Sequence, residues 1–289
     1  MSFDLTPIGS TLGARIHDLD VRNLSESDET DLKAAFAKHR VLVVQGQSLD
    51  ADEQVTFSER FGALYRMPYV KPLDDYADVI AVLKEADEVN VSTFGSWWHA
   101  DFSYLEEPPV YSILQALELP PKGGDTLFAD MCAAWDALSD GMKRLLEPMK
   151  VMHSGHIYGT RLSADGIKDR MRGVQVSTGH EEANVERAHP LVRLHRPTGR
   201  AALFCSPTYT TRLDGMTAVE SAPILNYLYD HIARPEFTIR QRWLAGDLLM
   251  WDNRAVVHLA VNDYDGYRRL LHRTTVASER PVAFNQENA

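Results

Sequence analysis

The sequence contains few cysteines, and this excludes two classes of site. Its only two, Cys132 and Cys205, stand far apart and without a nearby pattern of metal-ligand spacing. Neither a disulfide framework nor a thiolate metal site is therefore indicated. We expect both to be buried packing residues, and a nucleophile activated by a histidine is the less favoured alternative.

Basic charge and long apolar runs are also scarce. The chain has 30 Lys and Arg against 41 Asp and Glu, a net charge of −11, which argues against nucleic acid or an anionic membrane as partner. No apolar run approaches the ~20 residues of a membrane span, and "MSFDLTPIGS" lacks a basic stretch followed by an apolar one. We expect a soluble, cytoplasmic protein whose 289 residues and 44% hydrophobic content form a substantial core.

Strand and helix patterns alternate along the chain. Compact β-branched runs at 40–46 and 79–84 predict buried strands, while 31–39, 52–62 and 217–234 have helical patterns. The last of these opens with a Thr-x-x-Glu capping box. Short strand-like pieces separated by turns fill the C-terminal third, among them "FTIRQRW", "LLMWD", "VVHLAV" and "RRLLHRTTV", and "LVRLHRPTGRAALFC" predicts an earlier hairpin.

Many short strands at this spacing are typical of a sandwich or jelly roll. We therefore expect an α+β protein with a jelly-roll core and flanking helices. No linker divides the chain, so residues 1–289 are expected to form a single domain. The polar, glycine-containing stretch at about 160–190 is expected to be a lid or insertion.

The motif "WWHADFSY" places a histidine and an aspartate in an aromatic stretch where burial would be costly for both. In a strand, His99 and Asp101 would project from the same face. A distant histidine on another strand, for which His258 is the candidate, would complete the two-histidine, one-carboxylate set that holds Fe(II). A buried His–Asp hydrogen bond or a solvated loop explains most His-x-Asp pairs, so this pair alone is a weak indication.

A second cluster follows His258. Arg269 and Arg273 are separated by an even number of residues on "RRLLHRTTV" and would share a strand face. Two guanidinium groups directed into a cavity of an acidic protein indicate bound anions, because Arg matches the geometry of a carboxylate or sulfonate. Two surface salt bridges are the alternative.

Together, "WHADFSY", "GGDTLFAD", "GDLLMWDNRAVVH" and "DYDGYRRLLHRTTV" resemble the taurine dioxygenase family of Fe(II)/2-oxoglutarate-dependent oxygenases. The resemblance extends from Gly13 to Pro281, and "VMHSG", "PTGR" and "FTIRQRW" are most similar to the branch that acts on aryloxyalkanoates such as phenoxypropionate. It implies a double-stranded β-helix and three cofactors or cosubstrates: Fe(II), 2-oxoglutarate and O2. It also implies that His99, Asp101 and His258 are the iron ligands and the catalytic centre.

The same resemblance implies roles around the iron. Thr126 and Arg269 would bind the distal carboxylate of 2-oxoglutarate, and Trp251 would pack near this cosubstrate. Arg273 would hold the anionic end of the primary substrate. The expected partners are accordingly a small anionic organic substrate and further copies of the chain in a homo-oligomer.

Two positions depart from the pattern of taurine enzymes. Met67 and Gly95 stand where those enzymes place a histidine and an asparagine, which predicts a larger or more apolar substrate body. For any one aromatic residue, core packing is the more common role. His153 and His156 raise the question of a second metal or an acid–base role, and a pocket-lining role for one of them is a less favoured alternative. The residues expected to line the substrate pocket are Met67, Tyr69, Phe102, Tyr104, Tyr158 and Tyr209.

The leading functional hypothesis is a dioxygenase that hydroxylates a C–H beside a heteroatom in an aryloxyalkanoate, sulfonate or alkyl sulfate, releasing succinate and CO2. Two alternatives stay open. A zinc-dependent hydrolase would use the same His/Asp/His site to activate water without O2. A non-catalytic jelly-roll protein would bind 2-oxoglutarate without consuming O2.

Overall fold

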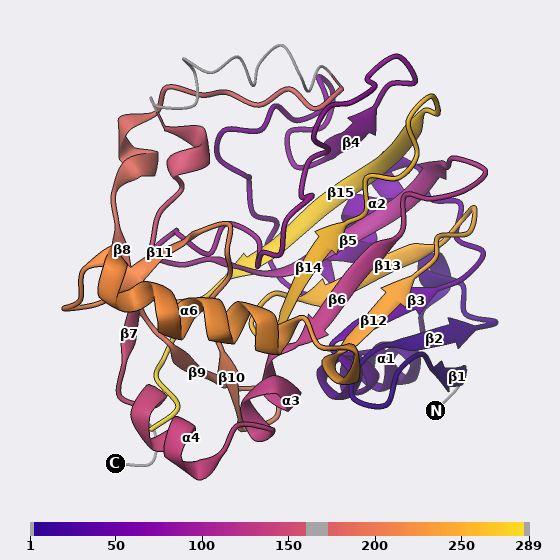
Figure 1. Ribbon diagram of the computed structural model, residues 1–289. Helices are drawn as coiled ribbons and strands as arrows, with labels where there is room; N and C mark the ends of the chain where they lie inside the picture. Colours follow the sequence, from indigo (N-terminus) through magenta and orange to yellow (C-terminus); the bar gives the residue numbers. More distant parts are fainter. Residues whose placement is uncertain (1–2, 160–172, 286–289) are drawn as a thin grey trace.

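The structure of the protein, a computed structural model, describes residues 3–159 and 173–285. Two β-sheets face each other, and helices cover their outer surfaces (Figure 1). The first sheet has the order β1 (Asp4–Pro7), β2 (Ala14–His17), β3 (Val41–Val44), β13 (Leu248–Asp252), β5 (Pro109–Glu118), β15 (Arg269–Ser278) and β4 (Ile80–Lys84). The second has the order β12 (Thr238–Gln241), β6 (Thr126–Asp130) and β14 (Val256–Ala260).

Apolar side chains fill the space between these two sheets. Val43 and Leu271 of the first sheet pack in one cluster with Phe128 and Val256 of the second, and all four are buried. The strands at 40–46 and 79–84 and those of the C-terminal third are confirmed. The expected mixture of sheet and helix is present, with the site described below between the two sheets.

The helices lie on the outer faces. On the far side of the first sheet, α1 (Glu26–His39) and α2 (Ala51–Glu59) bury Phe36 and Phe57 in a second cluster. α6 (Ala218–Ile232) and α3 (Met131–Asp136) pack in a third cluster with the second sheet. The capping box expected at 217–234 is present, since the side chains of Thr217 and Glu220 accept hydrogen bonds from each other's backbone N–H.

Two smaller sheets extend the molecule at the left of Figure 1. One has the order β11 (Thr210–Leu213), β7 (Lys150–His153) and β8 (Arg187–Pro190); the other is the predicted hairpin of β9 (Val192–His195) and β10 (Arg200–Leu203). α4 (Asp140–Leu146) precedes β7. Short 3-10 helices span Val21–Asn23, His156–Tyr158, Glu181–Asn184 and Pro235–Phe237.

Three further expectations concern the chain as a whole. Residues 160–172 of the expected lid lie outside the described residues, and the remainder of that stretch contains the 3-10 helix Glu181–Asn184 and β8. Cys132 and Cys205 are buried and unbonded, as expected for packing residues. Among the described residues, no helix combines the length and apolar character that crossing a membrane requires.

Candidate metal centre and adjoining cavities

Three buried side chains from distant segments meet between the two sheets. His99 and Asp101 precede β5, and His258 is the middle residue of β14. The backbones of His99 and His258 form a single antiparallel bridge with N···O distances of 3.0 and 2.8 Å. One ligand atom from each of the three side chains lies within 4.8 Å of the others. The convergence of these residues, predicted from the two motifs, is present in the fold.

The predicted strand around His99 and Asp101 is wrong. The chain turns at residues 101–104 directly after the bridge, and Phe102 has φ 46°, in the left-handed region. The Asp101 N–H donates to Oδ1 of Asn253 at 3.2 Å and has no sheet partner. A turn, and not the alternation of side chains along a strand, therefore brings the carboxylate towards the imidazoles.

Hydrogen bonding fixes the tautomer of one imidazole. Nδ1 of His99 lies 2.7 Å from the carbonyl oxygen of Trp97, which can only accept, so Nδ1 carries the proton. Nε2 of His99 is then the nitrogen that can bind a metal, and it lies 3.6 Å from Oδ1 of Asp101. Nε2 of His258 lies 3.8 Å from the same oxygen. Burial, reinforced by His99, holds the pKa of His258 well below its usual range.

The second oxygen of Asp101 is held by two donors. Arg273 and the hydroxyl of Ser112 both lie 2.6 Å from Oδ2. Burial alone would raise the pKa of Asp101, but the Arg273 guanidinium together with His258 and His99 outweighs burial and holds that pKa well below its usual range. The site thus presents one carboxylate and two imidazole nitrogens, Nε2 of His99 and Nε2 of His258. This is a donor set suited to Fe(II), with Oδ1 of Asp101 directed towards the two histidines.

Ser112 links the groups around the carboxylate. Its Oγ accepts hydrogen bonds from Arg273 at 3.1 Å and from Nδ2 of Asn253 at 3.0 Å, while Oδ1 of Asn253 accepts one from Nε1 of Trp251 at 3.0 Å. Sequence reasoning missed the roles of both Ser112 and Asn253. Ser112 was nevertheless visible as the one serine in the strand "PVYSILQALE", where a buried polar group needs a partner.

The two predicted arginines share a face of β15. Positions 269, 271 and 273 are buried and alternate with less buried residues, which confirms the predicted face. Arg269 is 3% exposed, its Nε has no partner, and its guanidinium lies 5.6 Å from the centre of the Trp243 ring. In the described part of the chain Arg269 forms no ion pair. A buried cation without a carboxylate is costly, so this geometry favours an exogenous anion.

A small cavity joins the arginines to the metal-ligating set. It has a volume of about 30 Å³ and is bounded by both histidines and by the residues predicted for the cosubstrate. Thr126 is fixed there because its Oγ1 accepts a hydrogen bond from Nε1 of Trp243 at 3.1 Å. The predicted residues on its wall are His99, Thr126, Trp251, His258, Arg269 and Arg273.

A larger cavity of about 320 Å³ shares His99 with the small cavity as a lining residue. Tyr158 and Tyr209 line it, and their hydroxyls lie 3.3 Å apart. Met67, Tyr69, Phe102 and Tyr104 pack in the same aromatic cluster but are not part of the cavity wall. Arg273 lines the small cavity and not this one.

Two further residues distinguish the wall of the larger cavity. Trp97 is 70% exposed at its edge, and sequence reasoning missed it. Of the two histidines considered for a pocket, His156 lines the cavity. His153 is buried elsewhere, with Nδ1 at 3.0 Å from Oγ of Ser103.

Comparison with known proteins places this geometry in context. A model of the family "Taurine catabolism dioxygenase TauD, TfdA family" matches residues 4–275. The chain is 31% identical over 287 residues to the alpha-ketoglutarate-dependent sulfate ester dioxygenase of Pseudomonas putida, covering 98% of this chain and 92% of that protein. It is 28% identical over 284 residues to the (S)-phenoxypropionate/alpha-ketoglutarate-dioxygenase of Sphingobium herbicidovorans, covering 96% of each.

A crystal structure of a taurine dioxygenase from Burkholderia xenovorans is similar to the whole fold. The TM-score is 0.81 at 29% identity, covering 98% of this chain and 93% of that one. The resemblance inferred from the motifs is confirmed along nearly the full length of the chain.

Proposed function

The chain belongs to the TauD, TfdA family of taurine catabolism dioxygenases, and we propose from that premise that it hydroxylates a C–H next to a heteroatom in a small anionic substrate. As a member of this family it is an oxidoreductase, a 2-oxoglutarate-dependent dioxygenase. The two facing sheets are proposed to form the double-stranded β-helix of a single dioxygenase domain.

The donor set fits Fe(II). His99, Asp101 and His258 would hold the ion, because two imidazoles and one carboxylate are buried together with one ligand atom of each within 4.8 Å of the others. When bound, Fe(II) with 2-oxoglutarate and O2 supplies the oxidising chemistry, in which one oxygen atom enters the substrate and the other enters succinate, with loss of CO2. The protein contributes position and exclusion of water.

The arginines supply the positive charge that two anions need. Arg269, buried and without an ion pair in the described chain, would bind the distal carboxylate of 2-oxoglutarate beside Thr126. Arg273 orients Asp101 and is proposed to hold the anionic end of the substrate as well. This buried, unpaired Arg269 next to the His/Asp/His set is the observation that carries the proposal, because neither a hydrolytic site nor a structural ion pair explains it.

The larger cavity suggests the body of the substrate. Its wall combines the rings of Tyr158, Tyr209 and Trp97 with the hydroxyl groups of several Ser and Thr residues, and because most of its surface is apolar it favours an apolar body attached to the anionic group. Burial raises the pKa of Tyr158 to about 12, so this phenol stays neutral and can donate a hydrogen bond. Alkyl or aryl sulfate esters and aryloxyalkanoates both meet this description, in keeping with what the relatives' names state.

Succinate release tests the proposal. Purified protein with Fe(II), ascorbate, 2-oxoglutarate and O2 is supplied with sulfate esters, sulfonates and aryloxy acids, and succinate is measured with and without each acid. We expect coupled succinate formation with at least one sulfate ester or aryloxy acid and none with the Asp101→Ala variant. Substrate cleavage that proceeds without O2 or 2-oxoglutarate would contradict the proposal and favour a hydrolase.

A further inference from the structure

The turn between β13 and β14 carries the side chain that holds the backbone of Asp101. Asn253 is the first residue of this turn. Its Oδ1 accepts the Asp101 N–H at 3.2 Å, and its Nδ2 donates to Oγ of Ser112 at 3.0 Å. Ser112 in turn donates to the Asp101 carboxylate. The position of Asn253 therefore sets where this carboxylate lies relative to the two histidines.

The two residues that flank Asn253 bind each other on the side away from the metal centre. Trp251 and Asn253 share one side, where they form a 3.0 Å hydrogen bond, and strand alternation directs Asp252 to the other. Oδ1 of Asp252 accepts from the backbone N–H and Nε of Arg254 at 3.0 and 2.9 Å, and its Oδ2 accepts from Nη2 at 2.7 Å. These bonds hold the backbone of the turn on both sides of Asn253.

The same turn is attached to two successive residues of β5. Asn253 bonds to Ser112, whereas Nη2 of Arg254 donates to the phenol oxygen of Tyr111 at 2.7 Å. The guanidinium of Arg254 also lies 4.9 Å from the centre of the Tyr111 ring. Because successive side chains of a strand point to opposite faces, the two attachments hold the turn from both faces of the first sheet.

Glu279 joins this turn to a second buried arginine. Its Oε2 accepts from Nη1 of Arg254 at 3.2 Å, and its Oε1 accepts from Nη2 of Arg193 at 3.1 Å. Nε2 of His195 lies 3.1 Å from Oδ2 of Asp252, which can only accept, so this nitrogen donates. Two arginines and two carboxylates thus balance each other in charge.

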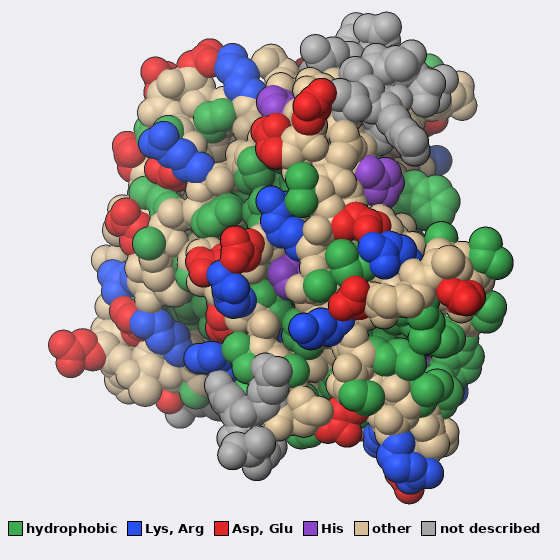
Figure 2. All heavy atoms as spheres, turned by 90° about the vertical axis from the view of Figure 1, so that its left-hand side faces the viewer, with side chains coloured by type: hydrophobic (Ala, Val, Ile, Leu, Met, Phe, Trp, Pro, Cys, Tyr) green, Lys and Arg blue, Asp and Glu red, His purple; other side chains and the backbone are tan. Residues whose placement is uncertain are grey.

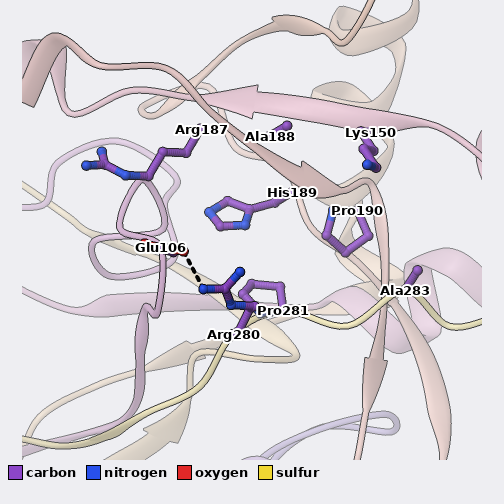
Figure 3. Close-up of a pocket in the computed structure, with 9 residues that line it drawn as sticks. All are labelled: Glu106, Lys150, Arg187, Ala188, His189, Pro190, Arg280, Pro281 and Ala283. Carbon is purple, nitrogen blue, oxygen red and sulfur yellow. Dashed lines mark hydrogen bonds and ion pairs between the residues drawn. The ribbon is translucent and has the colours of Figure 1, made fainter. Parts of the chain in front are cut away.

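The C-terminal segment that carries Glu279 is itself fixed. The Glu279 N–H donates to the carbonyl oxygen of Pro108 at 3.1 Å, and backbone hydrogen bonds of 2.9 and 3.1 Å pair residues 282–284 with β9. Arg280 forms an ion pair with Glu106, drawn as the dashed line in Figure 3. Glu279 therefore meets Arg254 from a fixed position.

Burial distinguishes this network from surface ion pairs. Figure 2 shows acidic and basic side chains close together on the face towards the small sheets, and exposed pairs of this kind contribute little. Arg193, Asp252 and Arg254 are by contrast buried. Burial alone would raise the pKa of Asp252, but Arg254, with His195, outweighs burial and holds that pKa below its usual range. A buried charge that loses its partner is costly, so the loss of one member strains the others.

We propose that Arg254 and Glu279 are positioning residues of the metal centre: through Asn253 they set the orientation of Asp101, and hence the affinity of the site for Fe(II). The inference rests on the iron site of the proposed function. Within the described chain, neither Arg254 nor Glu279 lines the small or the larger cavity. Their effect is therefore expected on metal binding and not through contact with the substrate.

Anaerobic titration of the full-length protein with Fe(II) tests the proposal with two variants that nearly keep the size of the side chain. Glu279→Gln removes the charge between two buried guanidinium groups, and Tyr111→Phe removes only the oxygen that accepts from Arg254. We expect Fe(II) binding to weaken about five-fold in Glu279→Gln and about three-fold in Tyr111→Phe, less than the about 10–100-fold of groups that contact a metal ligand. The absorption bands of the Co(II)-loaded protein, which report ligand geometry, should shift in Glu279→Gln.

Glu186→Gln is the matched control. Glu186 is also a partly exposed carboxylate paired with an arginine, Arg212 at 2.7 Å, and it lines neither cavity. Its replacement should leave Fe(II) affinity unchanged. Thermal unfolding of each variant shows that it is folded.

A double-mutant cycle with Asn253→Ala tests the path of the effect. Asn253→Ala cuts the link between the network and Asp101, and Fe(II) binding should weaken about ten-fold. Adding Glu279→Gln to this variant should then change Fe(II) affinity by less than about two-fold, because the network no longer reaches the carboxylate.

Three results overturn the proposal. Fe(II) affinity of Glu279→Gln and Tyr111→Phe could equal that of the wild type, or Glu186→Gln could lose as much as Glu279→Gln. Alternatively, Glu279→Gln could cost the same with and without Asn253, which would show an effect on the whole fold. A wild type that binds no Fe(II) would contradict the proposed function and this inference together, whereas wild-type binding with unchanged variants would contradict this inference alone.

Discussion

Replacing Ser112 by alanine isolates the group that orients the carboxylate of the metal centre. Ser112 donates to Oδ2 of Asp101 at 2.6 Å and accepts hydrogen bonds from Arg273 and Asn253. Its removal leaves a buried Nδ2–H of Asn253 without that acceptor and lets the carboxylate rotate about the remaining contact with Arg273. The substitution deletes one oxygen atom and leaves all three proposed metal ligands in place.

The expected magnitude follows from these contacts. A hydrogen bond to a charged group contributes about 1.5–3 kcal/mol, and groups that orient metal ligands typically alter metal affinity by about 10–100-fold. Because Arg273 still holds Oδ2, we expect the lower end, a loss of about ten-fold in metal affinity. The turnover of protein saturated with iron should change much less, since the ligands themselves are retained.

Anaerobic titration with Fe(II) against a chromophoric chelator measures this affinity. Ser58→Ala is the matched control, because Ser58 is also buried and also forms a 2.6 Å hydrogen bond, to Thr274, but lies on α2 away from the metal ligands. It should reduce stability without reducing metal affinity. Affinity of Ser112→Ala within two-fold of the wild type, or an equal loss in Ser58→Ala, would refute the reasoning.

Three further predictions concern other parts of the site. Arg269→Ala should abolish measurable 2-oxoglutarate binding, because Arg269 lines the small cavity. Its Fe(II) affinity should stay within a few-fold of the wild-type value, because the ion pair of Asp101 with Arg273 remains intact. Equal losses of 2-oxoglutarate and Fe(II) affinity would instead show a general disruption of the site. His156 lines the larger cavity and not the small one, so His156→Ala should change the KM values of a substrate panel more than it changes the affinity for Fe(II) or 2-oxoglutarate. Unchanged KM values would exclude a role of His156 in substrate binding. Burial, with His189, lowers the pKa of His153 to about 3, below the value of 6.5 that it has in the unfolded chain. The unfolded chain therefore binds more protons than the folded protein below pH 6.5. The free energy of unfolding falls by about 1.4 kcal/mol per pH unit as the pH drops from 6.5 towards 3. Urea unfolding of His153→Gln should show a shallower dependence over that range, and an unchanged slope would contradict the neutral, buried state of this imidazole.

Much of the fold could be predicted because its strands and helices have strong local patterns. The β-branched run at Val41–Val44 and the alternation along β15 needed no tertiary information. The helix expected at 31–39 is longer, however, because Ser25 and Asp28 form a capping box that starts α1 at Glu26. That capping box was present in the sequence and was missed.

The site was predictable in its members but not in its local geometry. His258 and the two arginines follow from strand alternation and motif spacing. The turn at Asp101 does not, because the left-handed Phe102 and the bond from Asp101 to Asn253 depend on contacts between distant segments. The sequence alone likewise could not tell which tyrosines line the larger cavity. Tyr209 does so, whereas Tyr104 packs in the same cluster without reaching the cavity wall.

An anaerobic crystal of the protein with Fe(II) and 2-oxoglutarate measures the central claim directly, through anomalous scattering at the iron edge. The account predicts one iron ion bound by Nε2 of His99, Nε2 of His258 and Oδ1 of Asp101, with the keto acid on the same ion and its distal carboxylate at Arg269. Iron bound elsewhere, or 2-oxoglutarate bound away from Arg269, would contradict it.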